Sequence, residues 1–185
     1  MKKKIATIIM IFPFLLMSQN EIEKKDKDTI HHEIKFNFSY LLFEKRINLI
    51  YERSFKTDAS LGISMLYNPN KSTIYIDHED SLPFSNIKEY NFHALFFIRK
   101  YLSKSSISDG VYLEGNIGYS FIEFYEEQSN SIRDLKQQNG FSVGGTLGYK
   151  IINNEGFLFE AMIGAGVNSS TFIYPRFGLL IGKRL

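Results

Sequence analysis

Residues 157–167 have the sequence FLFEAMIGAGV, in which one set of alternate positions is entirely apolar. That set contains Phe157, Phe159, Ala161, Ile163, Ala165 and Val167. The other set includes Glu160, Gly164 and Gly166. Successive side chains of a β-strand point to opposite faces. A period of two therefore predicts a strand with one apolar face and one face that carries charge and glycine.

The same period of two recurs along most of the chain, and no window has the period of an amphipathic helix. The alternating segments are 34–42, 47–55, 61–67, 90–98, 111–121, 141–149, 157–167 and 177–181. An even number of alternating segments of roughly ten residues is typical of bacterial membrane barrels. Closure also removes the edges that an open sheet would have to protect. The sequence therefore predicts an all-β chain folded as an eight-stranded antiparallel up-and-down transmembrane β-barrel.

The distribution of glycine indicates which face of the strands meets lipid. Eight of the 13 glycines share the phase of the polar residues: Gly62, Gly118, Gly144, Gly148, Gly164, Gly166, Gly178 and Gly182. Glycine within a strand marks a place where another group approaches closely, and the narrow lumen of an eight-stranded barrel is such a place. We therefore expect the polar face inside the barrel and the apolar face in lipid. A soluble barrel would have the reverse arrangement.

The first 19 residues have the features of a signal peptide. Lys2, Lys3 and Lys4 precede a mostly apolar stretch, 5–17, which is shorter than the roughly 20 residues of a membrane-spanning helix. We expect cleavage near Ser18–Gln19, with a retained N-terminal anchor as the alternative. The chain has no cysteine, which excludes a lipoprotein anchor and suits an oxidising compartment. The expected organisation is a signal peptide at 1–19, a flexible lead-in at 20–30 and an outer-membrane β-barrel at 31–185.

The expected connections fit an N-terminus on the periplasmic side of a Gram-negative outer membrane. The two longest, about 68–88 and 125–139, then fall on the outer side, where membrane barrels keep their longer loops. Those around 56–58 and 152–155 are short, as periplasmic turns are. The connection at about 102–109 is a little long for such a turn.

Several motifs resemble those of a known family. They are the Tyr51-Glu52-Arg53 step, the repeated Gly-x-x-Gly-Tyr steps at 115–119 and 145–149, and the ending PRFGLLIG at 175–182. In this order, over residues 31–185, the chain resembles the small outer-membrane β-barrel domains of the OmpA/OmpX-like superfamily, including members without an assigned function. The resemblance implies insertion by the outer-membrane assembly machinery, usually guided by a C-terminal strand that ends in an aromatic residue. This chain departs from that pattern, because it ends in Leu185.

Charged residues in the inward phase form the principal candidate site. The predicted lumen network consists of Arg46, Glu52, Arg99, Glu114, Lys150, Glu160 and Arg176, and Lys35 and Arg184 share its phase. Buried charges must be paired, and eight strands leave an interior just wide enough for side chains. We therefore expect a network that plugs the lumen, with a proton or ion path as the alternative. Arg176 is the predicted bridge between the glutamates.

The histidines and one acidic tract are weaker candidates. His31 and His32 could chelate a metal, but adjacent strand residues point to opposite faces, so solvated side chains are favoured. His93 is expected at mid-strand as a hydrogen-bonding group of the lumen. The tract Asp77, His78, Glu79 and Asp80 offers loop contacts or calcium ligands, yet it lacks EF-hand spacing. No His-x-Ser step of the kind expected in lipid A-modifying barrels is present, so no enzyme, metal or cofactor is predicted.

These features favour a structural or interaction role through the outer loops, where binding on rigid scaffolds usually resides. The expected partners are outer-membrane lipid and lipopolysaccharide, the assembly machinery, and an extracellular ligand of the long loops. The formal net charge of +2 gives no reason to expect nucleic acid. The alternatives are a narrow small-solute channel, a soluble lipocalin-like lipid carrier and an outer-membrane lipid hydrolase.

Overall fold

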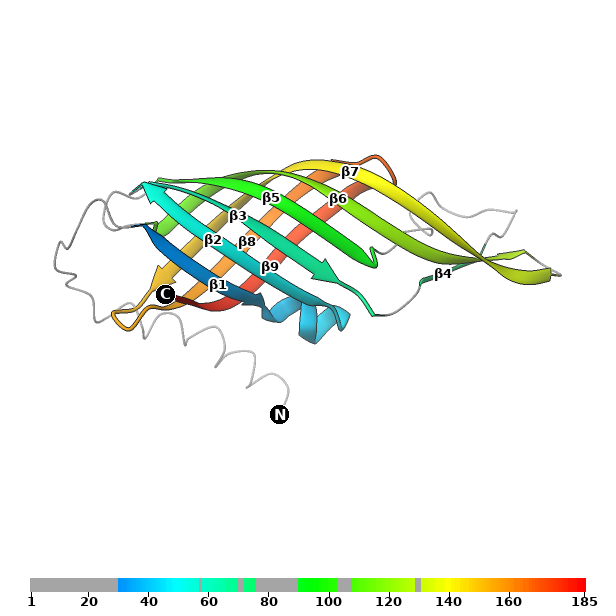
Figure 1. Ribbon diagram of the computed structural model, residues 1–185, viewed down its shortest axis with the longest axis horizontal. Coiled ribbons are helices and arrows are strands. Elements are labelled where there is room, and N and C mark those ends of the chain that lie inside the picture. The colour runs from blue at the N-terminus through cyan, green and yellow to red at the C-terminus, as the bar shows by residue number, and fades with distance from the viewer. Residues whose placement is uncertain (1–29, 57, 70–71, 76–89, 103–107, 129–130) are drawn as a thin grey trace.

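The computed structural model describes residues 30–56, 58–69, 72–75, 90–102, 108–128 and 131–185. The described elements, in chain order, are β1 (His31–Asn37), η2 (Tyr40–Glu44), β2 (Ile47–Lys56), β3 (Ala59–Tyr67), β4 (Ser72–Tyr75), β5 (Phe92–Tyr101), β6 (Gly110–Gln128), β7 (Ser131–Ile152), β8 (Phe157–Asn168) and β9 (Phe172–Arg184). Figure 1 shows the strands wrapping round one axis. The predicted signal peptide and almost all of the predicted lead-in lie outside the described residues.

Eight strands close into a barrel, as predicted. β1, β2, β3, β5, β6, β7, β8 and β9 each pair antiparallel with their neighbours in that order. The first and last strands complete the ring, in a register that runs from Glu33↔Arg184 to Asn37↔Leu180. The additional strand β4 pairs parallel with β6 at Ser72↔Phe124 to Tyr75↔Glu127, outside this ring. The prediction of an eight-stranded antiparallel up-and-down barrel is confirmed.

The two faces of the wall have the predicted polarity. Along β2, Glu52 and Ser54 are fully buried inside, whereas Leu49 and Tyr51 on the other face are 51% and 38% exposed. Exposed apolar residues recur on every barrel strand, and buried charges lie inside. Apolar outside and polar inside is the arrangement of a transmembrane barrel and the opposite of a lipocalin-type interior. No helix in the described part of the chain is long and apolar enough to cross a membrane.

The first strand is shorter than predicted, because the chain leaves the barrel wall after Asn37 and forms the single π-helical turn η2. Ser39 stabilises this departure. Its hydroxyl group donates to Asn37 Oδ1 over 2.7 Å and accepts from the Leu179 amide over 3.1 Å. Lys45 then adopts a left-handed conformation, with φ of 55°, and returns the chain to the wall at β2. The alternation through Leu42 therefore wrongly predicted a continuing strand.

The predicted loop at 125–139 is instead a continuation of the β6–β7 hairpin. The two strands pair from Gly110↔Lys150 to Gln128↔Ser131, with one register shift between Glu126 and Gln128. Figure 1 shows this hairpin projecting from one end of the barrel, beside β4. Beyond a membrane both faces of a hairpin meet water, so the backbone ladder persists while the apolar alternation that predicts strands disappears. In the other long connection, Asp77, His78, Glu79 and Asp80 lie outside the described residues.

The barrel thus has two distinct ends. The loop end carries η2, β4 and the β6–β7 projection, and the terminal end carries His31 and Arg184. At the terminal end, β2 ends at Lys56 and β3 begins at Ala59, while residues 153–156 connect β7 to β8, so both connections are as short as predicted. Gly156 allows the second turn, since its φ is 83° and its amide donates to the Asn153 carbonyl group over 3.0 Å.

Candidate functional site: the charged core and the cavity above it

Glu52 is at the centre of the buried charges. Its carboxylate accepts hydrogen bonds from Lys35 Nζ, from Arg99 Nη1 over 2.6 Å and from Lys150 Nζ over 3.1 Å. The hydroxyl groups of Tyr101 and Ser60 also donate to Glu52 Oε1, each over 2.6 Å. One carboxylate therefore links three cations that come from three different strands. We call the set of Glu33, Lys35, Glu52, Arg99, Glu114, Lys150, Glu160 and Arg176 the charged core.

Arg99 is the arginine that bridges the glutamates. Its Nε lies 2.7 Å from Glu114 Oε2, its Nη1 lies 2.6 Å from Glu52 Oε2, and its Nη2 lies 2.9 Å from Glu160 Oε1. Among the described residues, Arg176 forms its ion pair with Glu114. The prediction that Arg176 is the bridge is therefore wrong. The glycines near Arg176 leave space around its side chain. Arg99, however, is directly opposite Glu114 in the β5–β6 register, so its side chain lies next to the carboxylates.

Lys35 and Lys150 connect the first strand to β8 and β7, which lie two and three places away round the ring. Lys35 Nζ lies 2.6 Å from Glu160 Oε2 in β8, and Lys150 Nζ in β7 lies 2.9 Å from Glu33 Oε2 in β1. Sequence reasoning missed Glu33 and left Lys35 outside the predicted network. The sequence contains the pattern that could have identified them. Glu33 and Lys35 alternate in the same phase as Asn37, which places all three on the inward face of the strand. Arg184, in the same phase, lies 2.7 Å from Glu33 Oε1 at the terminal end.

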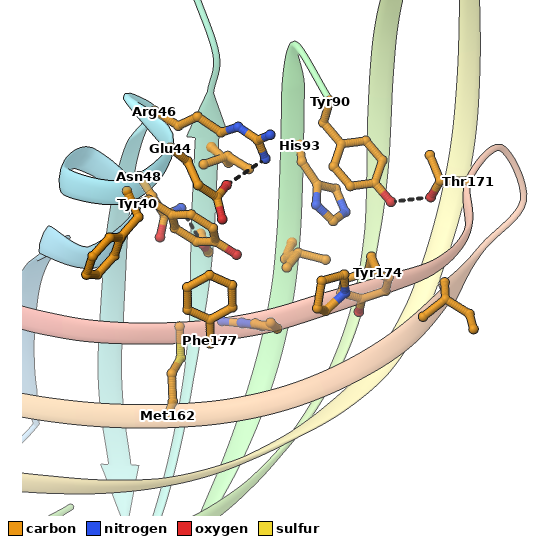
Figure 2. Close-up of a pocket in the computed structure, with 17 residues that line it drawn as sticks. Tyr40, Glu44, Arg46, Asn48, Tyr90, His93, Met162, Thr171, Tyr174 and Phe177 are labelled. Atoms are coloured by element: carbon orange, nitrogen blue, oxygen red, sulfur yellow. Dashed lines mark hydrogen bonds and ion pairs between the residues drawn. The ribbon is translucent and has the colours of Figure 1, made fainter. Parts of the chain in front are cut away.

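Of the seven predicted network residues, the structure brings six together: Glu52, Arg99, Glu114, Lys150, Glu160 and Arg176. Arg46 is the exception. It lies beyond η2 at the mouth of the barrel, where its Nη1 is 2.9 Å from Glu44 Oε2 (Figure 2). The shortened first strand explains this difference, since η2 supplies a carboxylate that the predicted strand would have placed elsewhere.

Tyr112 provides a direct test of how strongly the core is held. It is completely buried, and its hydroxyl group donates to Glu160 Oε1 over 2.5 Å. Replacing Tyr112 by Phe should lower the free energy of unfolding by about 1.5–3 kcal/mol, the usual contribution of a hydrogen bond to a charged group. Urea unfolding in lipid vesicles measures this. Tyr67→Phe, on the outer face where Tyr67 is 54% exposed, is the control. Equal stability of the two variants would contradict a tightly held core.

A cavity of about 470 Å³ lies towards the loop end, beyond the charged core. Residues of η2, β2, β3, β5, β8 and β9 line it, together with Tyr90 and Thr171. Figure 2 shows Tyr40 and Phe177 on one side of this space and Tyr90, His93 and Tyr174 on the other. The Tyr90 hydroxyl group hydrogen-bonds Thr171 Oγ1 over 2.5 Å and so fixes one part of the rim.

His93 lies in this cavity, at the second position of β5, and not at mid-strand as predicted. Its Nε2 is 2.9 Å from Ser142 Oγ, its ring stacks on Tyr90 with centroids 4.6 Å apart, and it contacts the edge of Tyr174. The predicted strand began at residue 90, which displaced His93 inwards. Ser142 is 6% exposed and is not among the cavity-lining residues, so the pair does not present a nucleophile to the cavity.

The terminal histidines also have definite positions. His31 and His32 open β1 instead of preceding it, and His32 Nδ1 is 2.5 Å from the Tyr51 hydroxyl group. Within the described ranges, no three His, Cys, Asp or Glu side chains form a group that could hold a metal ion.

Comparison with known proteins adds one similar structure. No protein-family model and no curated protein matches the chain. The crystal structure of the N-terminal beta-barrel domain of Pseudomonas aeruginosa OprF is similar, with 11% sequence identity, a TM-score of 0.46, and coverage of 86% of this chain and 98% of that chain. The fold described above rests on the strand pairing of this chain alone. The narrower, OmpX-like part of the sequence resemblance stays a prediction.

Proposed function

We propose that the chain is an integral outer-membrane barrel whose lumen is closed by the charged core and whose loop end faces the outside. The observation that supports this most directly is the complete burial of the central charges. The side chains of Lys35, Glu52, Arg99, Lys150 and Glu160 are all 0% exposed. An interior this full has no room for a continuous water path.

The charged core spans the lumen instead of lining it. Lys35 of β1 contacts Glu160 of β8, Arg99 of β5 contacts both Glu52 and Glu160, and Lys150 of β7 contacts Glu52 of β2. The Lys150–Glu52 contact joins strands on opposite sides of the ring, and the other contacts join strands two or three places apart. Next to them, a cluster of buried apolar and aromatic side chains fills the cross-section: Ile50, Phe97, Tyr101, Tyr112, Met162 and Leu180.

The role that fits a closed barrel is structural support or recognition at its loop end. The β6–β7 projection and β4 extend beyond the wall there, and binding on a rigid scaffold is usually found on such projections. On this proposal the chain is exported, inserted by the outer-membrane assembly machinery and surrounded by outer-membrane lipid and lipopolysaccharide. The proposal includes no catalytic activity.

Planar-bilayer recording tests the closed lumen. The native barrel should give no steady single-channel steps, because the ion-paired side chains block the cross-section. A double variant, Arg99→Ser with Glu160→Ser, removes one charge of each sign and the bulk of both side chains. It should show steady conductance while keeping its net charge. Steps of similar size from the native protein would contradict the closed lumen and favour a narrow channel.

A further inference from the structure

The barrel wall is incomplete at the loop end, between β9 and η2. β1 pairs with β9 only from Glu33↔Arg184 to Asn37↔Leu180, because β1 ends at Asn37. β9 continues for eight further residues, 172–179, and there its strand partner is β8 alone. The opposite side of this part of β9 therefore has no strand beside it. We call the space between 172–179 and η2 the lateral gap.

The sequence of β9 is suited to an edge without a partner strand. The Leu179 amide donates to Ser39 Oγ over 3.1 Å, and the Phe177 carbonyl group accepts from Asn37 Nδ2 over 3.3 Å, so side chains replace the missing ladder. The backbone hydrogen-bonding groups along a strand alternate in direction. The backbone nitrogen of Pro175 therefore points to the same side of β9 as the backbone groups of Phe177 and Leu179. Proline lacks an amide hydrogen and is tolerated where no neighbouring strand requires one.

The cavity borders this lateral gap. Its lining includes Phe43 of η2 together with Ile173, Pro175 and Phe177 of β9, as well as the inward-facing Arg176. Ile173 and Phe177 are 55% and 36% exposed on the outer face, whereas Arg176 is 3% exposed. The cavity is therefore lined by both outward and inward residues of this strand, and the Tyr40 ring of η2 lies 5.5 Å from the Phe177 ring at this rim.

The lateral gap lies beside exposed apolar residues. Ile173 is in register with Val167, which is in register with Val143, and these side chains are 55%, 55% and 54% exposed. η2 adds three more exposed apolar side chains at the rim of the gap: Leu41, Leu42 and Phe43. An opening between such surfaces connects the cavity with the hydrocarbon region of the membrane and not only with water.

Two arginines and one glutamate line the cavity: Arg46, Arg176 and Glu44. Arg176 pairs with Glu114 through Nη1, and its Nη2 is buried with no hydrogen-bond partner among the described residues. Arg46, paired with Glu44, lines the same cavity nearer the mouth. A buried guanidinium nitrogen without an acceptor is costly, and a carboxylate is the acceptor that its geometry suits best.

We propose that this cavity binds a single-chain carboxylate amphiphile, such as a long-chain fatty acid, that enters from the membrane through the lateral gap. The carboxylate contacts Arg176, and the alkyl chain passes between Phe43 and Phe177 into the lipid. This inference goes beyond the proposed function and does not depend on the closed lumen. Conductance by the native barrel would overturn the closed lumen and leave this site untouched.

The chain contains no tryptophan, so one introduced tryptophan reports a single place. Phe177→Trp puts the probe at the lateral gap. Leu147→Trp is the control, because Leu147 is in register with Ile163, which is in register with Phe177, and it faces lipid two strands away. Both proteins are folded in phospholipid vesicles and titrated with a fatty acid that carries bromine along its chain, which quenches nearby tryptophan.

The proposal predicts saturable quenching of the Phe177→Trp protein, at least about two-fold stronger than in the Leu147→Trp protein. Adding Arg176→Gln should raise the half-saturation concentration about ten-fold, the loss expected for a charge-assisted hydrogen bond. If the Arg176→Gln protein does not fold, Ser64→Phe provides a second test. The added ring fills the cavity without changing its charge, so it should abolish the saturable part of the quenching. Equal quenching of both tryptophan proteins would overturn the site. Equal binding of the methyl ester would overturn the carboxylate class, and binding of short water-soluble carboxylates alone would overturn entry from lipid.

Discussion

Replacing Glu52 by Gln is expected to lower the free energy of unfolding by about 3–5 kcal/mol, the cost of removing one partner from a buried ion pair. The substitution keeps the shape of the side chain but removes the carboxylate that Lys35, Arg99 and Lys150 share. Three fully buried cations would then compete for the carboxylates that remain. Urea unfolding of the refolded protein in lipid vesicles, followed by the loss of the compact band on unheated gels, measures this change.

Glu155→Gln is the matched control for that experiment. Glu155 is an exposed residue in the turn between β7 and β8, so the same chemical change there should alter stability by less than about 0.5 kcal/mol. If the Glu52 and Glu155 variants unfold at the same urea concentration, the charged core does not stabilise the barrel.

Gly148→Ala is the second substitution with a large expected effect. A methyl group at Gly148 would overlap the ring and hydroxyl group of Tyr112, which is completely buried and has no room to move away from Glu160. Overpacking of a filled interior costs about 1–3 kcal/mol. The same urea titration should therefore show a clear loss of stability, although alanine is normally preferred over glycine within a strand.

The control lies in the same Gly-x-x-Gly-Tyr step. A methyl group at Gly145 would face outwards, and the nearest atom would be the Glu114 carbonyl oxygen at an ordinary 3.5 Å. Gly145→Ala should therefore leave stability unchanged or raise it slightly. Equal effects of the two substitutions would mean that Gly148 is not required by close packing against Tyr112.

The fold was predictable from sequence because the membrane imposes a two-sided pattern on every strand. Side chains such as Ile163 face lipid while neighbours such as Gly164 face the lumen, and this contrast is visible in the sequence. The alternation did not predict the structure of segments that lie beyond the barrel wall. The hairpin at 122–139 is paired by its backbone although its sequence lacks the alternation, and η2 carries apolar residues without being a strand.

The candidate site was predictable in composition but not in connectivity. Phase alone places Glu52, Arg99 and Glu160 in the lumen. The choice of Arg99 over Arg176 as the bridge depends on strand stagger, which no local pattern encodes. Glu33 was missed because the expected alternation began at residue 34, three residues after the start of β1. The cavity and the lateral gap depend on where β1 ends, and the hydrogen bonds of Ser39 stabilise the chain at that point.

The central claim is that this sequence forms a closed membrane barrel with its polar face inside. Cells that express the full chain should be fractionated, and the protein compared on SDS gels with and without boiling. We expect the chain in the outer-membrane fraction, with a compact band that changes mobility on boiling. A soluble protein with one band, unchanged by boiling, would contradict the membrane barrel.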